Sequence, residues 1–179
     1  MSNVVIVSGS PGSGKTTLCE SLAASRQDGV HLASDFFYEF LSHRLDPTTP
    51  ESHRQNTVII RAVASAALAY AKGGYEVYLD GVIGPWFLPE FRPFLEPAVA
   101  THYVVLKASL GEANARVRGR EGPGLSPIVG AMQPKFMDLG PLSRHAVDAE
   151  NRSKDELLSE VSAGLESGAF ALDWSKVEP

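Results

Sequence analysis

Short apolar runs, each bounded by turn-forming or polar residues, recur along the chain. Runs of this length and composition are typical of strands that are buried inside a parallel sheet. They predict strands at residues 4–7, 30–33, 75–79 and 101–107, and a weaker pattern predicts a fifth at residues 145–148. Longer segments with helical spacing lie between them, and this alternation predicts an α/β sandwich around a parallel sheet.

Helices are predicted where apolar or alanine positions repeat at helical spacing until turn residues stop the pattern. They cover residues 16–25, 57–72, 111–120 and 153–165. The second helix ends at the pair Gly73-Gly74. The last begins with a predicted capping box, in which Ser153 and Glu156 satisfy each other's backbone N–H groups.

The remaining segments lack the pattern of a regular element and predict loops. Residues 43–56 are polar and contain two prolines, and the stretch from residue 84 combines glycine and proline with aromatic residues. Residues 122–134 contain several glycines and prolines and are expected to be mobile. We therefore expect a single domain over residues 1–179, with a mobile lid around residues 116–134.

Composition then excludes several classes of protein. The chain has 179 residues, of which 44% are hydrophobic, and this suits one globular domain. The formal net charge of −5 counts against a large nucleic-acid footprint. The single cysteine, Cys19, excludes an internal disulfide and is expected to be a small core residue, which fits a cytoplasmic setting. No run of about 18 apolar residues is present to span a membrane, and no basic, apolar signal peptide precedes the first strand.

Candidate chemistry begins directly after the first predicted strand. Residues 9–16 read GSPGSGKT and fit the pattern G-x-x-x-x-G-K-[ST] at every fixed position. The backbone N–H groups of such a loop surround a phosphate, so side chains at Gly12 and Gly14 would collide with it. Lys15 is expected to reach the β- and γ-phosphates and Thr16 to ligate Mg²⁺. The predicted nucleotide contacts in this loop are Gly9, Ser10, Pro11, Gly12, Ser13, Gly14, Lys15, Thr16 and Thr17.

This loop resembles the Walker A loop of P-loop NTPases. A glycine-rich turn without a ligand is the alternative, but the position between a predicted strand and a predicted helix favours phosphate binding. The sequence N-K-x-D, which is typical of guanine recognition, is absent, so ATP is the expected nucleotide.

Two aspartates follow predicted strands. Asp35 lies twenty residues after Lys15, just past the second strand, and Asp80 follows the third. Because strand carboxyl ends face the ligand crevice of an open parallel sheet, Asp35 is predicted to contact substrate and to accept a proton from an attacking hydroxyl. Asp80 is predicted to hold Mg²⁺, like a Walker B residue, or to contact substrate. The structural alternatives are a helix cap for Asp35 and a turn for Asp80.

Arginines gather in the run NARVRGREGPG, at residues 114–124. Arg116 and Arg120 are four residues apart, so they would share one face of a helix. Arginines on a lid stabilise charge on a transferring phosphoryl group and exclude water, which favours transfer over hydrolysis. A solvated basic face is the alternative.

Basic and histidine residues elsewhere suggest weaker candidates. The pairs His43-Arg44 and His53-Arg54 repeat within the polar segment. Arg54 is predicted to contact an anionic substrate, the other members of the pairs are weaker candidates, and solvated surface roles are the alternative. His102 and His145 flank predicted strands and are expected in core or edge positions, and no Cys/His cluster suggests zinc.

The order of elements is similar to that of the small-molecule kinases of the P-loop class. These include gluconate and shikimate kinases, chloramphenicol phosphotransferases and zeta-toxin-like kinases, with nucleotide kinases as more distant relatives. The resemblance implies a three-layer α/β sandwich with a five-stranded parallel sheet in the order 2-3-1-4-5, the P-loop nucleoside triphosphate hydrolase fold. It also implies that Asp35 serves as base, that Arg116 lies over the adenine, that Arg120 reaches the phosphates and that residues 149–152 border the adenine.

The chain also departs from each of these families. Only Asp35 stands where shikimate kinases carry D-x-D, and GVIGP does not match their G-G-G segment. Asp80-Gly81 stands where chloramphenicol phosphotransferases have paired aspartates. These differences leave the acceptor of the phosphate open.

The leading interpretation is an ATP- and Mg²⁺-dependent kinase that transfers the γ-phosphate to a hydroxyl of a small metabolite, antibiotic or nucleotide. One alternative is a regulatory protein that binds ATP without catalysis or with slow hydrolysis. A kinase for nucleic-acid 5′-hydroxyls is a third interpretation, although the acidic balance counts against it.

Overall fold

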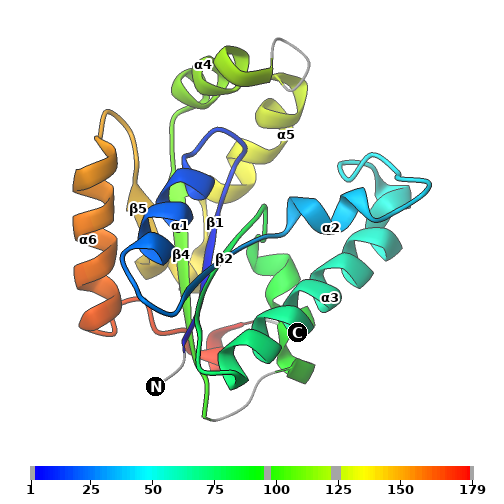
Figure 1. The fold of residues 1–179 in the computed structure, drawn as a ribbon. Coiled ribbons are helices and arrows are strands. Elements are labelled where there is room, and N and C mark those ends of the chain that lie inside the picture. The colour runs from blue at the N-terminus through cyan, green and yellow to red at the C-terminus, as the bar shows by residue number, and fades with distance from the viewer. Residues whose placement is uncertain (1–2, 95–97, 122–125, 178–179) are drawn as a thin grey trace.

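The computed structural model describes residues 3–94, 98–121 and 126–177, apart from the side chains of residues 117–121 and 126–128. Its centre is an all-parallel sheet of five strands in the order β2-β3-β1-β4-β5 (Figure 1). The strands are β1 (Asn3–Gly9), β2 (Gly29–Ala33), β3 (Glu76–Asp80), β4 (Ala100–Lys107) and β5 (Ala146–Asp148). The predicted fold class and strand order are confirmed.

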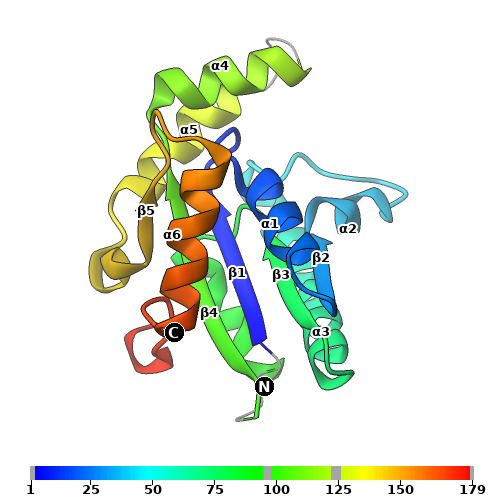
Figure 2. The same cartoon turned by 60° about the vertical axis from the view of Figure 1, so that its left-hand side comes forward.

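Helices form a layer on each face of the sheet (Figures 1 and 2). The α-helices are α1 (Lys15–Ala24), α2 (Asp35–Glu39), α3 (His53–Lys72), α4 (Leu110–Glu121), α5 (Ser126–Met137) and α6 (Lys154–Glu166). The 3₁₀ helices are η1 (Pro50–Ser52), η2 (Pro85–Phe94), η4 (Gly140–His145) and η5 (Trp174–Lys176). Helices α1 and α6 cover one face, while α3 and η2 cover the other. None of the helices within the described residues is long and apolar enough to cross a bilayer.

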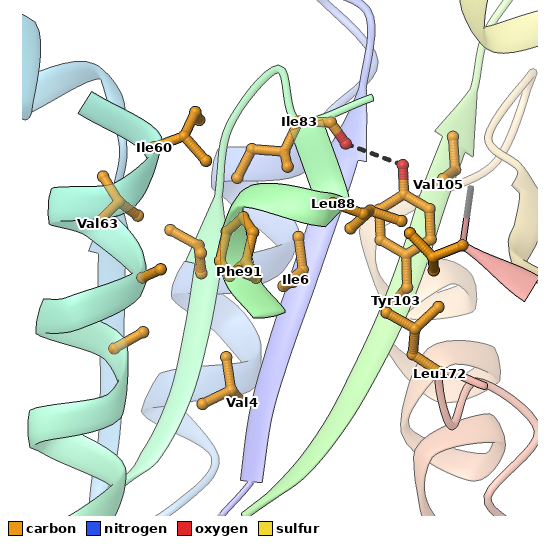
Figure 3. Close-up of a cluster of buried hydrophobic side chains, with 14 of the residues drawn as sticks. Val4, Ile6, Ile60, Val63, Ile83, Leu88, Phe91, Tyr103, Val105 and Leu172 are labelled. Atoms are coloured by element: carbon orange, nitrogen blue, oxygen red, sulfur yellow. Dashed lines mark hydrogen bonds between the residues drawn. The ribbon is translucent and has the colours of Figure 1, made fainter. Parts of the chain in front are cut away.

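Strand β1 contributes side chains to two hydrophobic cores. Val4 and Ile6 face α3 and η2, in the cluster shown in Figure 3. Val5 and Val7 face α1 and α6, in the cluster that also contains Cys19. Cys19 is fully buried, as predicted, and burial raises the pKa of its thiol, so it acts as a small hydrophobic residue.

The parallel register brings the carboxyl ends of the central strands together. Val7 and Ala33 both lie opposite Asp80, on its two neighbouring strands. The loop after β3 is fixed at Ile83, whose N–H donates to Ser8 Oγ at 3.0 Å and whose carbonyl accepts from the Tyr103 hydroxyl at 2.8 Å (Figure 3). Helices α4 and α5 lie over this end of the sheet, next to the loop after β1 (Figure 2). A ligand crevice is expected at such an edge.

The prediction of a loop over residues 43–56 is wrong at its end, because α3 begins at His53. The early helical residues Gln55 and Asn56 face the preceding segment. The Gln55 side chain hydrogen-bonds both the N–H and the carbonyl of Leu45, and Asn56 Nδ2 donates to the carbonyl of Pro47 at 2.8 Å. These long-range bonds compensate for a polar first turn that has no apolar periodicity.

The segment expected to be mobile, residues 122–134, includes the first part of α5, which begins at Ser126; residues 122–125 lie outside the described part. Packing against the rest of the protein overrides the low helix propensity of glycine and proline. Val129 is buried against Ala108 and Ala113, and Phe136 is buried in the core beside α3 and η2. Whether the segment moves as a lid remains a prediction.

Smaller differences concern the elements on either side. The stretch from residue 84, predicted to be irregular, forms η2 and buries Leu88 and Phe91. Strand β5 begins one residue later than predicted, because His145 ends η4; both His145 and His102 are buried, as expected. The capping box of Ser153 and Glu156 is present at the start of α6.

Candidate active site

The loop between β1 and α1 forms a backbone cradle at the carboxyl edge of the sheet. Gly12 and Gly14 have φ values of 80° and 99°, which side chains rarely adopt. Gly14 precedes α1 and supplies no side-chain cap, so the first N–H groups of the helix point towards a ligand position. Lys15 is 8% exposed, and its Nζ donates to the carbonyl of Ser10 at 3.0 Å. The loop fits an anionic phosphate, and its contacts with a nucleotide stay a prediction.

Gly9 begins this cradle and leaves no space for a side chain. Its φ is 142°, and a Cβ atom there would lie 2.4 Å from the carbonyl oxygen of Leu106. Replacing Gly9 with alanine is therefore expected to lower the free energy of unfolding by about 1–3 kcal/mol, measured by urea denaturation. The matched control is Gly111→Ala, where nothing lies within 4 Å of the new Cβ. This control is expected to retain or gain stability; equal losses in both variants would contradict the steric account.

Arg116 connects α4 to the phosphate loop. Its guanidinium lies 3.4 Å from the carbonyls of Gly12 and Ser13 and 3.5 Å from the carbonyl of Ala149, and it also pairs with Glu112. The structure therefore brings together the loop, α4 and the segment after β5, which were predicted to surround the nucleotide. The backbone of Arg120 lies in the same helix, but its side chain is outside the described part.

Asp80 has a partner that the sequence analysis missed. Nε2 of His31 donates to Oδ2 of Asp80 at 2.7 Å, and the Asp80 carboxylate is buried. Because His31 lies two residues before Ala33 on β2, and Ala33 is paired with Asp80, both side chains reach the same face of the sheet. The only sequence signal was a histidine within an otherwise apolar strand.

The hydrogen bond to Asp80 raises the pKa of His31 above its ordinary 6.5, although burial acts in the opposite direction. The stabilisation from this pair is therefore fully present below pH 6.5 and is lost as the pH rises through the raised pKa of the folded state. The free energy of unfolding of the wild type should exceed that of His31→Gln by the largest amount near pH 5.5 and by the smallest amount near pH 8.5. Urea unfolding at a series of pH values measures this difference, and a constant difference would contradict the prediction.

A cavity of about 720 Å³ opens between the phosphate loop, α2, the segment before α3 and α5. The lining residues that belong to the phosphate loop or to the elements beside it are Pro11, Gly12, Lys15, Thr16, Asp80 and Arg116, and we call this part the phosphate end. The remaining lining residues are Ser34, Asp35, Tyr38, Glu39, Asn56, Ile60, Val82, Phe87, Met132 and residues 44–48. Thus Asp35, the exposed first residue of α2, shares one cavity with Lys15, Thr16 and Asp80.

Thr16 and Asp80 offer oxygen atoms to a cation at the phosphate end of this cavity. The described residues contain no group of three or more His, Cys, Asp or Glu side chains that could hold a metal alone. Mg²⁺ does not require one, because it commonly takes one or two protein oxygens together with phosphate oxygens and water. The residues present therefore fit a nucleotide-bound Mg²⁺.

The predicted basic substrate contacts, Arg54 and the weaker candidate Arg44, differ in whether they line this cavity. Arg54 is exposed on α3 and is not among the residues that line the cavity. Arg44, the weaker candidate, does line it, and its guanidinium lies 6.0 Å from the centre of the Tyr38 ring. The segment that carries Arg44 is hydrogen-bonded to α3 through Gln55 and Asn56.

Comparison with curated proteins identifies relatives among nucleotide kinases. A cytidylate kinase from Pyrobaculum aerophilum is 34% identical over 126 residues, which are 68% of this chain and 62% of that protein. A cytidylate kinase from Pyrobaculum calidifontis is 29% identical over 164 residues, or 89% of this chain and 84% of that protein. The chain thus spans less than two thirds of the first relative's length.

Comparison with solved structures shows the same fold at low sequence identity. A sugar kinase from Janibacter sp. HTCC2649 superposes with a TM-score of 0.69 and 18% identity, covering 97% of this chain and 100% of that one. A gluconokinase from Sinorhizobium meliloti 1021 gives a TM-score of 0.63 and 18% identity, with 93% of each chain covered. The fold expected from the resemblance to P-loop small-molecule kinases is therefore confirmed.

The family assignment rests on a match that includes the phosphate loop, both aspartates and Arg116. It extends over residues 5–124, from β1 to the end of α4, and therefore contains the phosphate end of the cavity. On this match, the chain belongs to the AAA domain family of P-loop proteins.

Proposed function

We propose that this protein is an ATP-dependent phosphotransferase that moves the γ-phosphate of ATP to a hydroxyl of a small molecule. The observation that carries the proposal is the single cavity whose lining includes Lys15, Thr16 and Asp35. A protein that only binds or hydrolyses a nucleotide needs no cavity beyond the phosphate loop, whereas this cavity extends to α2 and to the segment before α3. The kinase names of the curated relatives support the same class of reaction.

In this proposal the phosphate loop and Lys15 bind the β- and γ-phosphates. Their N–H groups and the ammonium group stabilise negative charge that develops on the transferring phosphoryl group. Mg²⁺, held through Thr16 and Asp80, would supply further charge neutralisation when bound. The hydrogen bond from His31 orients the Asp80 carboxylate. Arg116 closes the nucleotide side between the loop and the segment after β5.

The part of the cavity lined by α2 and by the segment before α3 is called the acceptor end. There, Asp35 accepts the proton of the attacking hydroxyl as the oxygen–phosphorus bond forms. Helix α5 supplies Met132 to the cavity lining, and in this proposal the helix reduces the access of water to the reacting groups. Arg120 is proposed to reach the transferring phosphate from α4, as the resemblance to P-loop kinases implies. The contacts that orient the acceptor come from Tyr38 and the segment before α3.

The test is ADP release from Mg²⁺-ATP in the presence of a panel of hydroxylated metabolites, nucleosides, nucleotides and antibiotics. Release that one acceptor stimulates, with a phosphorylated product identified by mass spectrometry, supports the proposal. Tight ATP binding with no stimulated release by any acceptor would instead favour a regulatory protein controlled by its nucleotide state.

The curated relatives favour a second candidate, transfer to the phosphate of cytidine monophosphate. This reaction uses the same phosphate loop but needs no base, because a phosphate acceptor is already ionised. It predicts that Asp35→Asn retains most activity, whereas transfer to a hydroxyl predicts a large loss.

A further inference from the structure

The charges around the acceptor end of the cavity are predominantly negative. Among the lining side chains that the structure describes there, Asp35, Glu39 and Asp46 are carboxylates and Arg44 is the basic residue. Lys15 and Arg116 lie at the other end, against the phosphate loop, where the phosphates of a nucleotide would use their charge. The acceptor end is therefore acidic before any ligand binds.

Arg44 does not reverse this balance. Its guanidinium lies 6.0 Å from the centre of the Tyr38 ring, and it also acts on the nearby Asp46 carboxylate. Oδ1 of Asp46 accepts hydrogen bonds from the N–H of Thr48 at 2.9 Å and from its hydroxyl at 2.7 Å. These bonds lower the pKa of Asp46, so the carboxylate stays ionised at neutral pH.

The segment that carries Asp46 is also held in position by hydrogen bonds. Gln55 Oε1 accepts from the N–H of Leu45 at 2.8 Å, and Gln55 Nε2 donates to the carbonyl of Leu45 at 3.1 Å. Asn56, which is buried, donates to the carbonyl of Pro47 on the other side of Asp46. With the backbone attached to α3 on both sides, Asp46 has little freedom to move away from a ligand.

The cavity lining also contains apolar side chains. They are Ile60, Val82, Phe87 and Met132, and Tyr38 packs against the same hydrophobic cluster as Val82 and Phe87. A ring-shaped ligand would bury apolar area against these side chains. The cavity lining thus combines apolar side chains with carboxylates.

We propose that the phosphate acceptor is an uncharged or amine-bearing ring compound with a free hydroxyl, and not a phosphate or carboxylate anion. This inference rests on the proposed kinase function and narrows its substrate class. An anionic acceptor would enter a cavity whose lining carries the carboxylates of Asp35, Glu39 and Asp46, and these like charges would repel it. Cytidylate and gluconate, for which the relatives are named, are both anions, so this chain would differ from them.

The experiment uses matched pairs of compounds that differ in charge: cytidine with cytidine 5′-monophosphate, glucose with glucuronate, and glucosamine, as the amine-bearing ring, with the same glucuronate. ADP release gives kcat/KM for each, and isothermal titration of protein loaded with Mg²⁺ and ADP gives each Kd. The uncharged or amine-bearing member of each pair is expected to be preferred by about 10-fold or more in Kd. Preference for the anionic member, or equal values within every pair, including no binding by either member, would overturn the inference.

Charge-neutralising variants identify the source of the preference. The double variant Glu39→Gln, Asp46→Asn should reduce the preference to about threefold or less, because it removes two of the carboxylates. Glu51→Gln is the matched control, since Glu51 is an exposed carboxylate of η1 outside the cavity lining, and it should leave the preference unchanged. A binding preference without ADP release from any compound would contradict the proposed kinase function. It would still support the inference that the site prefers uncharged or amine-bearing ligands.

Discussion

Replacement of Lys15 by alanine is expected to lower kcat for phosphotransfer by about 10²- to 10³-fold. The Lys15 ammonium is buried at the phosphate loop and is held by the carbonyl of Ser10 at 3.0 Å, so it is already in position when a nucleotide enters. Its charge stabilises the transferring phosphoryl group in a cavity partly closed to water, where solvent does not replace it. Steady-state ADP release measures the effect, using an acceptor identified from the panel.

The control for Lys15→Ala is Lys154→Ala, which removes an exposed lysine at the first position of α6. This variant should keep the wild-type kcat. Thermal unfolding of both variants separates loss of catalysis from loss of fold. A Lys15→Ala protein that is folded and retains wild-type turnover would show that the loop serves another purpose than phosphate transfer.

Replacement of Asp35 by asparagine is expected to lower kcat by about 10²- to 10⁴-fold, the range of general-base catalysis. Asparagine preserves the shape of the side chain but cannot accept the proton of the acceptor hydroxyl. Asp35 is the exposed first residue of α2 and lies on the cavity lining, so the fold should tolerate the change. ADP release with a confirmed acceptor measures kcat, and KM for ATP should change little.

Asp155→Asn provides a matched control for Asp35→Asn. Asp155 also lies in the first turn of a helix, so both variants lose a similar favourable interaction with the helix dipole. Only the Asp35 variant should lose activity. If Asp35→Asn retained full kcat, Asp35 would not be the base, and transfer to an ionised phosphate acceptor would become the better account.

The parts of the site that follow from local sequence were predictable before the structure. The phosphate loop is one contiguous motif, and the positive φ values of Gly12 and Gly14 are backbone conformations that favour glycine at these positions. Asp35 and Asp80 could be placed at one edge of the sheet because both follow strands of a parallel sheet. The strand order followed from the resemblance to P-loop kinases, since periodicity alone does not determine which strands are neighbours.

The parts that depend on long-range contacts were not predictable. The pairing of His31 with Asp80 depends on the register of β2 against β3, which local sequence does not specify. Helix α5 forms despite Gly130 and Pro134 because Val129 and Phe136 are buried against other elements. The early start of α3 depends on the side-chain hydrogen bonds of Gln55 to Leu45 and of Asn56 to Pro47.

The hydrogen bonds of Gln55 and Asn56 hold one part of the cavity lining independently of the phosphate loop. Residues 44–48 are attached to α3 through Gln55 and Asn56, while the phosphate loop is built on β1 and α1. Residues 44–48 can therefore change in sequence while the pairing of the strands and the backbone geometry of the phosphate loop stay the same. Under the proposed function, substitutions in this stretch would change the acceptor while the residues that bind ATP stay the same.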